Sequence, residues 1–144
     1  MIYLGSDHAG LELKKLIQKH LQERGEKEVD LGAFKIEPPT DYPEIAHEVA
    51  EKVIENKGSK GILVCGTGIG MCMAANKHAG IRGANCESKE TVEMSRKHND
   101  SNVLCLGGRV LDAKTALEMV DAFLDTKFEA EERHVRRVQK IEKA

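Results

Sequence analysis

The residues best suited to chemistry lie in one glycine-rich stretch, residues 65–70, which reads Cys-Gly-Thr-Gly-Ile-Gly. The apolar run Ile62-Leu63-Val64 precedes it and predicts a buried strand, whereas residues 71–75 contain Met and Ala and favour a helix. A strand, a glycine turn and a helix start together present backbone N–H groups to an anion. A helix amino terminus also favours the thiolate form of a nearby cysteine, so Cys65 adds a reactive group beside the predicted anion site.

This turn differs from the common phosphate-binding and phosphate-cleaving motifs. A Walker A loop continues with Lys and then Ser or Thr, but Met71 follows the last glycine here. A dinucleotide-binding loop needs the spacing Gly-x-Gly-x-x-Gly, whereas Gly66, Gly68 and Gly70 alternate, and the next predicted strand ends in Asn85 rather than an acid. A cysteine phosphatase would require an arginine at position 71. We therefore expect the turn to bind an anion beside a thiol without hydrolysing phosphate.

Two histidines and two arginines are further candidates. His8 and His98 each lie at the end of a predicted strand beside Asp or Asn, where a histidine serves either as a general acid or base or as a helix cap. Arg133 and Arg137 are four residues apart on one face of a predicted helix. They suit a bidentate phosphate clamp or a solvated helix end, and the spacing leaves both interpretations open.

Five short apolar runs alternate with amphipathic segments along the chain. The strands are expected near residues 1–6, 29–32, 62–64, 81–85 and 103–107, and the helices near residues 11–24, 42–56, 71–75, 88–98, 112–124 and 129–143. This alternation predicts an α/β fold with a parallel sheet covered on both faces. Ligands of such sheets bind at the carboxyl ends of the strands. We expect one sheet edge to gather the polar residues 7–8, 65–70, 98–100 and 107–109.

Composition excludes several classes of partner. The 22 basic and 24 acidic residues nearly balance, aromatic residues make up 3% of the chain, and there is no Trp, so neither charge nor base stacking supports nucleic-acid binding. No apolar run approaches the roughly 18 residues that span a membrane, and Met1 leads directly into a strand, which predicts one cytoplasmic domain over residues 1–144. The spacing of the four cysteines fits neither a zinc site nor a disulfide framework, and we expect Cys72, Cys86 and Cys105 to be buried structural residues.

Eight short motifs, taken together, are specific. They are Asp7-His8-Ala9-Gly10, Asp41-Tyr42-Pro43, Cys65-Gly66-Thr67-Gly68-Ile69-Gly70, Ala74-Ala75-Asn76-Lys77, Gly80-Ile81-Arg82, His98-Asn99-Asp100, Gly108-Arg109-Val110 and Arg133-His134. In order and spacing, from residue 1 to about residue 140, they resemble the type B ribose-5-phosphate isomerase family, which also includes allose 6-phosphate and galactose 6-phosphate isomerases.

The resemblance implies a Rossmann-like, three-layer α/β/α sandwich with a five-stranded parallel sheet and a C-terminal helix. It implies an aldose–ketose isomerase without metal or other cofactor that interconverts ribose 5-phosphate and ribulose 5-phosphate through a cis-enediolate. Such enzymes are homodimers or homotetramers with active sites at the subunit interface. The helix near residues 129–143 is therefore expected to reach a neighbouring subunit.

The resemblance also implies a role for each matching residue. Cys65 would be the base that moves a proton between C2 and C1, and His98 would open the furanose ring with help from Asp7 or Thr67. The enediolate oxygen would be bound by Asn99 and by backbone N–H groups, namely those of Gly66, Gly68, Ile69 and Gly70.

The phosphate and the sugar are assigned to other residues by the same resemblance. The phosphate would be held by His8, Arg109, Arg133 and Arg137, with both tail arginines contributed by the neighbouring subunit. Tyr42 would line the sugar pocket. Many family members have Gly-Gly before the tail arginine, whereas this chain has Ala130-Glu131-Glu132, which is one residue longer.

Two other functions remain open at this stage. Within the same class, the chain could isomerise a hexose 6-phosphate, either allose 6-phosphate or galactose 6-phosphate. From another class, it could be a regulator that binds a sugar phosphate without turnover. A thiol redox protein using Cys65 and Cys72 is a weaker hypothesis, because a glycine turn separates two cysteines that are seven residues apart.

Overall fold

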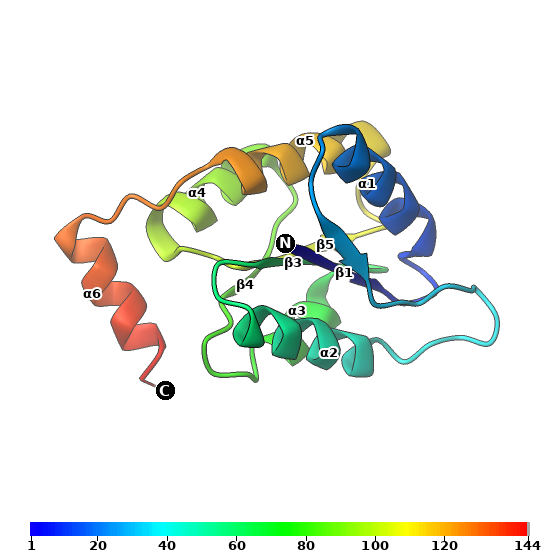
Figure 1. The fold of residues 1–144 in the computed structure, drawn as a ribbon, viewed down its shortest axis with the longest axis horizontal. Coiled ribbons are helices and arrows are strands. Elements are labelled where there is room, and N and C mark those ends of the chain that lie inside the picture. Colours follow the sequence, from blue (N-terminus) through cyan, green and yellow to red (C-terminus); the bar gives the residue numbers. More distant parts are fainter. Residues whose placement is uncertain (144) are drawn as a thin grey trace.

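Five parallel strands form a single sheet between two layers of helices, as the alternation of the sequence predicts (Figure 1). The computed structural model describes residues 1–143. Neighbouring strands lie in the order β2-β1-β3-β5-β4, and every pair is parallel. The strands are β1 (Ile2–Ser6), β2 (Glu28–Asp30), β3 (Lys60–Cys65), β4 (Gly83–Asn85) and β5 (Val103–Gly107). The helices are α1 (Leu11–Glu23), α2 (Tyr42–Glu55), α3 (Ile69–Ala75), α4 (Lys89–Asn99), α5 (Ala113–Asp125) and α6 (Glu132–Ile141).

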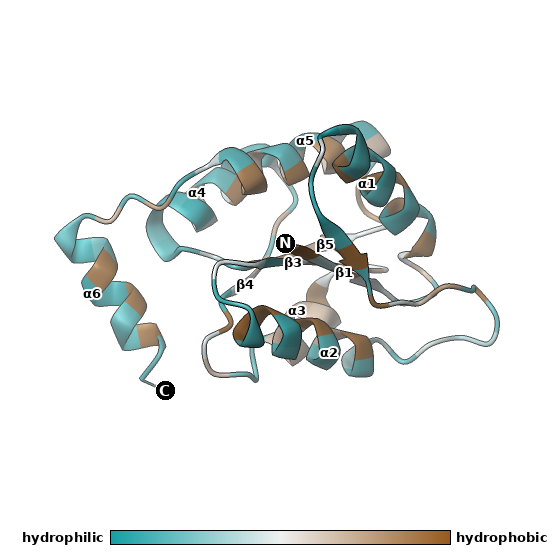
Figure 2. Ribbon diagram, viewed as in Figure 1, coloured by the Kyte–Doolittle hydropathy of each residue, from teal (hydrophilic) through white to brown (hydrophobic). Residues whose placement is uncertain are grey.

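The sheet has a hydrophobic core on each face. Helices α1, α4 and α5 cover one face, and α2 and α3 cover the other (Figure 1). Side chains alternate along each strand, so Leu4 and Ile62 pack in the first core, whereas Tyr3 and Leu63 pack in the second. The apolar sides of these helices face the sheet (Figure 2). Burial on both faces explains why the central strands are uninterrupted apolar runs.

The chain places β2 on one side of β1 and then crosses to the other side, where β3, β5 and β4 lie. Helix α1 leaves the end of β1 toward one face, and α3 leaves the end of β3 toward the other (Figure 1). Such a switch point opens a crevice outside the carboxyl ends of the two strands. Asp7 and His8 directly follow β1, and Cys65 is the last residue of β3, so the fold places both motifs at this crevice.

Several predicted boundaries need correction. Strand β4 begins at Gly83 rather than at residue 81, and Ile81 is buried ahead of the strand. Helix α6 begins at Glu132 rather than at residue 129. Strand β2 ends at Asp30, two residues earlier than expected. The Ser88 side chain caps α4 by accepting a hydrogen bond from the Thr91 N–H. Asp41 occupies the cap position of α2 without a side-chain hydrogen bond, and Pro43 lies in the first turn of this helix.

The long loop, residues 33–41, is attached at its base by a buried lysine that the sequence did not single out. Lys14 Nζ lies 2.6 Å from Asp30 Oδ1 and 2.5 Å from the carbonyl oxygen of Ala33. The loop and α6 lie at opposite ends of the molecule (Figure 1). Among residues 1–143, no helix is both long enough and apolar enough to span a membrane.

Candidate active site

Three loops meet around Cys65 at the carboxyl edge of the sheet. The Asp7 N–H donates to the Val64 carbonyl (3.2 Å), the Gly108 N–H to the Cys65 carbonyl (2.7 Å), and the Arg109 N–H to the Gly66 carbonyl (3.0 Å). Backbone hydrogen bonds thus join residues 7–10, 65–70 and 107–109 into one unit. The predicted grouping of these three motifs is confirmed.

Close backbone contacts in this unit require glycine at two positions. Gly68 has φ +83°, and a Cβ there would lie 2.4 Å from Asn85 Nδ2 and 2.9 Å from the Leu106 carbonyl carbon. A Cβ on Gly10 would lie 2.2 Å from the Val64 carbonyl oxygen. Any side chain at either position would push the loops apart, so the glycines keep the crevice closed around the thiol.

The Cys65 sulfur lies at the base of the turn and accepts a hydrogen bond from the Gly68 N–H at 3.1 Å. The residue is only 5% exposed. Within residues 1–143 the N–H groups of Gly66, Thr67 and Gly70 make no hydrogen bond, whereas the Ile69 N–H donates to Thr67 Oγ1 at 3.2 Å. A polar N–H contact stabilises a thiolate, and unpaired N–H groups beside it can stabilise a developing oxyanion.

The predicted side chains of this edge surround the turn. Asp7 is buried, and its Oδ1 accepts from the Gly10 N–H at 2.9 Å. His8 Nδ1 accepts from the Thr40 N–H at 3.2 Å, which leaves Nε2 to donate to a ligand. The Tyr42 ring lies against Gly70, where a Cβ would be 2.6 Å from it.

Arg109 completes this edge. Its side chain is exposed and lies over the glycine turn, with Nη1 3.4 Å from the Cβ position of Gly66. We call this group the carboxyl-edge half-site; its members are Asp7, His8, Tyr42, residues 65–70 and Arg109.

The prediction that His98 and Asn99 share this edge is wrong. Both lie in the last turn of α4, and residues that lead into a strand lie at its amino end. The Asn99 carbonyl accepts from Arg82 Nε at 3.1 Å, and nearby Asn102 accepts from the Gly61 N–H at the start of β3. The length of β5, about 13 Å at the usual rise per residue, separates this edge from the other one.

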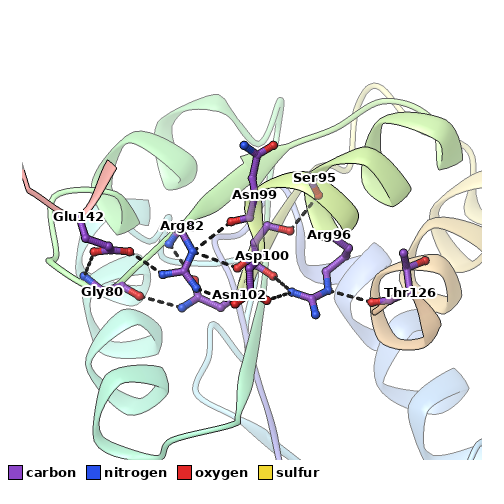
Figure 3. Close-up of polar contacts among 10 residues, drawn as sticks. Gly80, Arg82, Ser95, Arg96, Asn99, Asp100, Asn102, Thr126 and Glu142 are labelled. Carbon is purple, nitrogen blue, oxygen red and sulfur yellow. Dashed lines mark hydrogen bonds and ion pairs between the residues drawn. The ribbon is translucent and has the colours of Figure 1, made fainter. Parts of the chain in front are cut away.

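A polar network fixes the end of α4 (Figure 3). Asp100 has φ +47° and caps the helix, while its carboxylate accepts from Arg96 at 2.8 Å and from Arg82 at 3.2 Å. Arg96 also donates to the Thr126 carbonyl at 3.1 Å, and Arg82 pairs with Glu142 beyond α6. The side chain of Asn99 points away from this network (Figure 3). The sequence showed Arg82 only as part of a family motif and gave no signal for Arg96 or Glu142.

His98 lies against α6. Its ring stacks on that of His134, with centroids 4.5 Å apart and planes 10° from parallel. His134 is buried with its Nε2 unpaired within residues 1–143, and burial, followed by the positive charge of Arg133, lowers the pKa of His134. The ligand atoms of His98, His134 and Glu129 lie within 4.8 Å of one another. Because the two imidazole rings are nearly parallel, their nitrogen lone pairs do not converge on one ion, so the arrangement does not suit a metal.

Arg133 and Arg137 are exposed on α6, and Arg133 pairs with Glu131. Both belong to α6, the helix whose His134 stacks on His98. Helix α6 lies at the other end of the molecule from the carboxyl ends of the strands (Figure 1). We call His98, Asn99, Arg133 and Arg137 the amino-edge half-site. One chain therefore holds both sets of predicted residues but does not bring them together.

Comparison with known proteins identifies close relatives of the whole chain. Residues 2–141 match the Ribose/Galactose Isomerase family. The chain is 45% identical over 140 residues to the ribose-5-phosphate isomerase B of Escherichia coli K12, covering 97% of this chain and 93% of that protein. A ribose 5-phosphate isomerase from Thermotoga maritima superposes with a TM-score of 0.95 at 40% identity, covering 99% and 97% of the two chains. The Mycoplasma genitalium ribose-5-phosphate isomerase B with bound ribulose-5-phosphate superposes with a TM-score of 0.95 at 44% identity, covering 99% and 93%.

Proposed function

Because this chain belongs to the Ribose/Galactose Isomerase family, we propose that it interconverts D-ribose 5-phosphate and D-ribulose 5-phosphate through a cis-enediolate. The observation that supports this most directly is the Cys65 sulfur, hydrogen-bonded to the Gly68 N–H in a turn where the N–H groups of Gly66, Thr67 and Gly70 make no hydrogen bond within residues 1–143. The names of the relatives, and the ribulose-5-phosphate bound to one of them, indicate the same substrate pair. The direct test is to incubate the protein with ribose 5-phosphate and to assay ribulose 5-phosphate.

Cys65 is the proposed base for proton transfer. A thiolate is basic enough near neutral pH to remove the C2 proton and return it to C1, provided that the enediolate is stabilised at the same time. The N–H groups of Gly66, Thr67 and Gly70, which have no hydrogen-bond partner in the part of the chain that the structure describes, lie in the same turn and would supply that stabilisation. Because they are backbone groups fixed by the loop contacts, they need no rearrangement when the charge develops.

The remaining steps require residues from the other half-site. His98 is the proposed acid and base for opening the furanose ring, with Asp7 or Thr67 assisting, and Asn99 is the proposed partner of the enediolate oxygen. Since His98 and Cys65 lie at opposite sheet edges of one chain, we propose that a second copy supplies His98 and Asn99. A symmetric dimer would then contain two complete sites, each built from both chains; a tetramer of such dimers would preserve them.

The surface of each half-site supports this association. Helix α6 has an apolar stripe in which Val135 and Val138 are half-buried and Ile141 is exposed (Figure 2). Ile69 and Met73 are exposed beside the glycine turn, at 49% and 64%. Exposed apolar side chains next to both half-sites are typical of an interface between copies.

The phosphate is assigned to the end of the pocket away from the enediolate. His8 Nε2 and the Arg109 guanidinium would contribute from one chain, and Arg133 and Arg137 from its partner. The distance from the turn to His8 Nε2 and to Arg133 and Arg137 of the second copy would set the length of substrate accepted. A side-by-side assay with allose 6-phosphate and galactose 6-phosphate distinguishes a hexose-phosphate isomerase, which the family description also permits.

A regulator without turnover is distinguished by isotope exchange. If the protein binds ribose 5-phosphate saturably but neither isomerises it nor exchanges its C2 proton with deuterated water, the proposed activity is contradicted. Saturable binding together with exchange supports the isomerase.

A further inference from the structure

Asn85 has no role in the reaction proposed above, yet its side chain reaches the turn that carries Cys65. It is the last residue of β4, and β5 lies between that strand and β3. In the register of the sheet, Asn85 pairs with Cys105 of β5, whereas Cys65 pairs with Gly107 of the same strand. Asn85 is exposed and belongs to neither hydrophobic core, so packing does not explain its position.

The Asn85 amide bridges two backbone carbonyl groups. Its Nδ2 donates to the Cys105 carbonyl at 3.2 Å and to the Thr67 carbonyl at 3.3 Å. An amide nitrogen has two hydrogens, so each carbonyl receives one of them. The opposite orientation would place Oδ1 against two carbonyl oxygens, which repel it, so these contacts determine which way the amide faces. Within residues 1–143 the Thr67 carbonyl accepts no other hydrogen bond.

The Thr67 carbonyl belongs to the peptide group whose N–H is that of Gly68. This group is planar and trans, so its C=O and N–H point in opposite directions. The N–H donates to Cys65 Sγ at 3.1 Å, while Asn85 holds the carbonyl on the other side. The hydrogen bond to the carbonyl therefore determines the direction of the N–H that contacts the thiol.

The backbone of the turn also permits the reverse orientation of this peptide. Gly68 has φ +83° and ψ −12°, the angles of the third residue of a type II turn. Glycine adopts the negative φ of a type I turn as readily, and in that turn the central peptide is turned over. The Gly68 N–H would then point away from Cys65. The local sequence alone does not fix the contact with the thiol, so a residue outside the turn has to select it.

The surroundings of the Thr67 carbonyl suit the observed orientation. A Cβ on Gly107 would lie 2.7 Å from the carbonyl oxygen, so only glycine leaves room for it at the end of β5. The two cysteines beside this contact, Cys86 and Cys105, are buried as predicted, whereas Cys72 of α3 is half-buried and its assignment as a buried structural residue is corrected. The turn thus packs closely against the end of β5.

We propose that Asn85 is a positioning residue for Cys65: its amide holds the peptide between Thr67 and Gly68 so that the N–H faces the sulfur. A thiolate accepts this hydrogen bond more strongly than a neutral thiol does, so the contact favours the ionised base. In the proposed mechanism Asn85 itself contacts neither the substrate nor the reacting atoms. Its effect on catalysis rests on the proposed function, whereas its effect on the reactivity of the Cys65 thiol does not.

The test compares Asn85→Leu and Asn85→Asp with a matched control, Asn76→Asp. Leu has a similar size but no donor, and the carboxylate of Asp has no hydrogen to donate at neutral pH and repels the Thr67 carbonyl. Asn76 likewise joins the end of α3 to β4, since its Nδ2 donates to the Gly83 carbonyl at 3.0 Å and its Oδ1 accepts from the Gly83 N–H at 2.7 Å. It makes no hydrogen bond to residues 65–70 within the described chain, so its loss should not reach the thiol.

The first measurement is the rate at which iodoacetamide alkylates Cys65, located by fragmentation of the tryptic peptide 61–77, which also contains Cys72. At pH 7 both Asn85 variants should react about tenfold more slowly than wild type, as for the loss of one hydrogen bond to a charged group. Asn76→Asp should react within about twofold of wild type. The rates should converge near pH 10, where a thiol ionises without this contact. A merely structural role predicts the opposite change, because a loosened turn would expose Cys65 and speed up its alkylation.

The second measurement is deuterium exchange at C1 of ribulose 5-phosphate. Exchange should be about tenfold slower in both Asn85 variants and within about twofold of wild type in Asn76→Asp, with a similar KM in all four proteins. Equal or faster alkylation in the Asn85 variants, equally slow alkylation in Asn76→Asp, or normal exchange in the Asn85 variants of an active protein would overturn the proposal. If wild type neither isomerises nor exchanges the substrate but the alkylation rates differ as expected, the positioning role is supported and the proposed function alone fails.

Discussion

The two half-sites of this chain are built in different ways. At the carboxyl edge, backbone hydrogen bonds and glycine contacts join three loops around a thiol that is 5% exposed. At the amino edge, side chains project from the ends of two helices, and the ion pairs of Asp100, Arg82 and Arg96 determine their positions. The first half-site is complete within one folded chain. The second faces solvent in one chain, and we infer that it acts only after association.

This difference separates the chemistry of the two edges. Proton transfer needs a base and an oxyanion site fixed with respect to each other, and in the proposed mechanism the shared turn at Cys65 would meet that need. In the proposed mechanism, ring opening moves protons on oxygen rather than on carbon, and the phosphate lies at the far end of the sugar, so these steps can use residues of a second chain. Mutations at the two edges should therefore differ in their effects on exchange, on association and on stability.

The largest expected effect is at Cys65. Cys65→Ala should reduce isomerisation about 10³-fold, within the range for removal of a general base, and should equally abolish deuterium exchange at C1 of ribulose 5-phosphate. His98→Asn should reduce net conversion but retain most of that exchange, because the acyclic ketose needs no ring opening. Exchange is measured by NMR in deuterated water. Loss of exchange in both variants to the same extent would contradict the separation of roles.

Mixing two inactive variants tests the composite site. If each site takes Cys65 from one chain and His98 from the other, a heterodimer of Cys65→Ala with His98→Asn contains one intact site. Equal mixing with random exchange should restore about a quarter of wild-type activity, since half of the dimers are mixed and half of their sites are intact. Each variant mixed with itself is the control. No recovery after confirmed subunit exchange would place both residues of a site in one chain.

Gly68 tests the rigidity of the carboxyl edge, and Gly25 provides a matched control. Both have left-handed backbones, at φ +83° and +75°, but a Cβ on Gly25 would meet nothing within 4 Å. Gly25→Ala should cost only the conformational penalty of about 1–2 kcal/mol. Gly68→Ala should cost more and reduce kcat about tenfold or further, because it displaces Asn85 and disturbs the N–H groups of the turn. Urea unfolding and steady-state kinetics measure the two effects; equal behaviour of the variants would show that the turn tolerates a side chain.

Arg82 tests the amino edge in the same way. Arg82→Met removes one of the two arginines that pair with Asp100 and the arginine that pairs with Glu142, and should lower the free energy of unfolding by roughly 1–3 kcal/mol. Arg136→Met removes an exposed pair with Glu132 on α6 and should cost less than about 0.5 kcal/mol. Exchange at C1 should be preserved in Arg82→Met, whereas net conversion should fall as His98 loses its support. Denaturant titrations of both variants, compared with wild type, give the difference.

The sequence predicted the layers and the carboxyl edge because both depend on local patterns. Buried parallel strands are continuous apolar runs, and a tight turn between a strand and a helix needs glycines at fixed positions. The prediction that His98 lies at the carboxyl edge fails because it does not distinguish the two ends of a strand. Chain order alone places a residue that precedes a strand at the amino end of that strand. The ion pairs of Lys14 with Asp30 and of Arg82 with Glu142 join residues 16 and 60 positions apart. Such partners depend on the folded arrangement, and no spacing rule identifies them.

The smallest expected effect concerns the pH dependence of α6. Burial, followed by the positive charge of Arg133, lowers the pKa of His134, and Glu131 opposes this only in part. The unfolded chain then binds a proton more readily than the folded one, so stability should fall as pH drops below the ordinary histidine pKa of about 6.5, until the folded pKa is passed. His134→Phe keeps an aromatic ring beside His98 but cannot titrate, so its unfolding should depend less on pH between 7 and 5. A role for His134 in holding this helix would be contradicted if the free energies of unfolding of wild type and His134→Phe, from denaturant titrations, changed equally with pH. Equal rates of amide hydrogen exchange in α6 of the two proteins would contradict it as well.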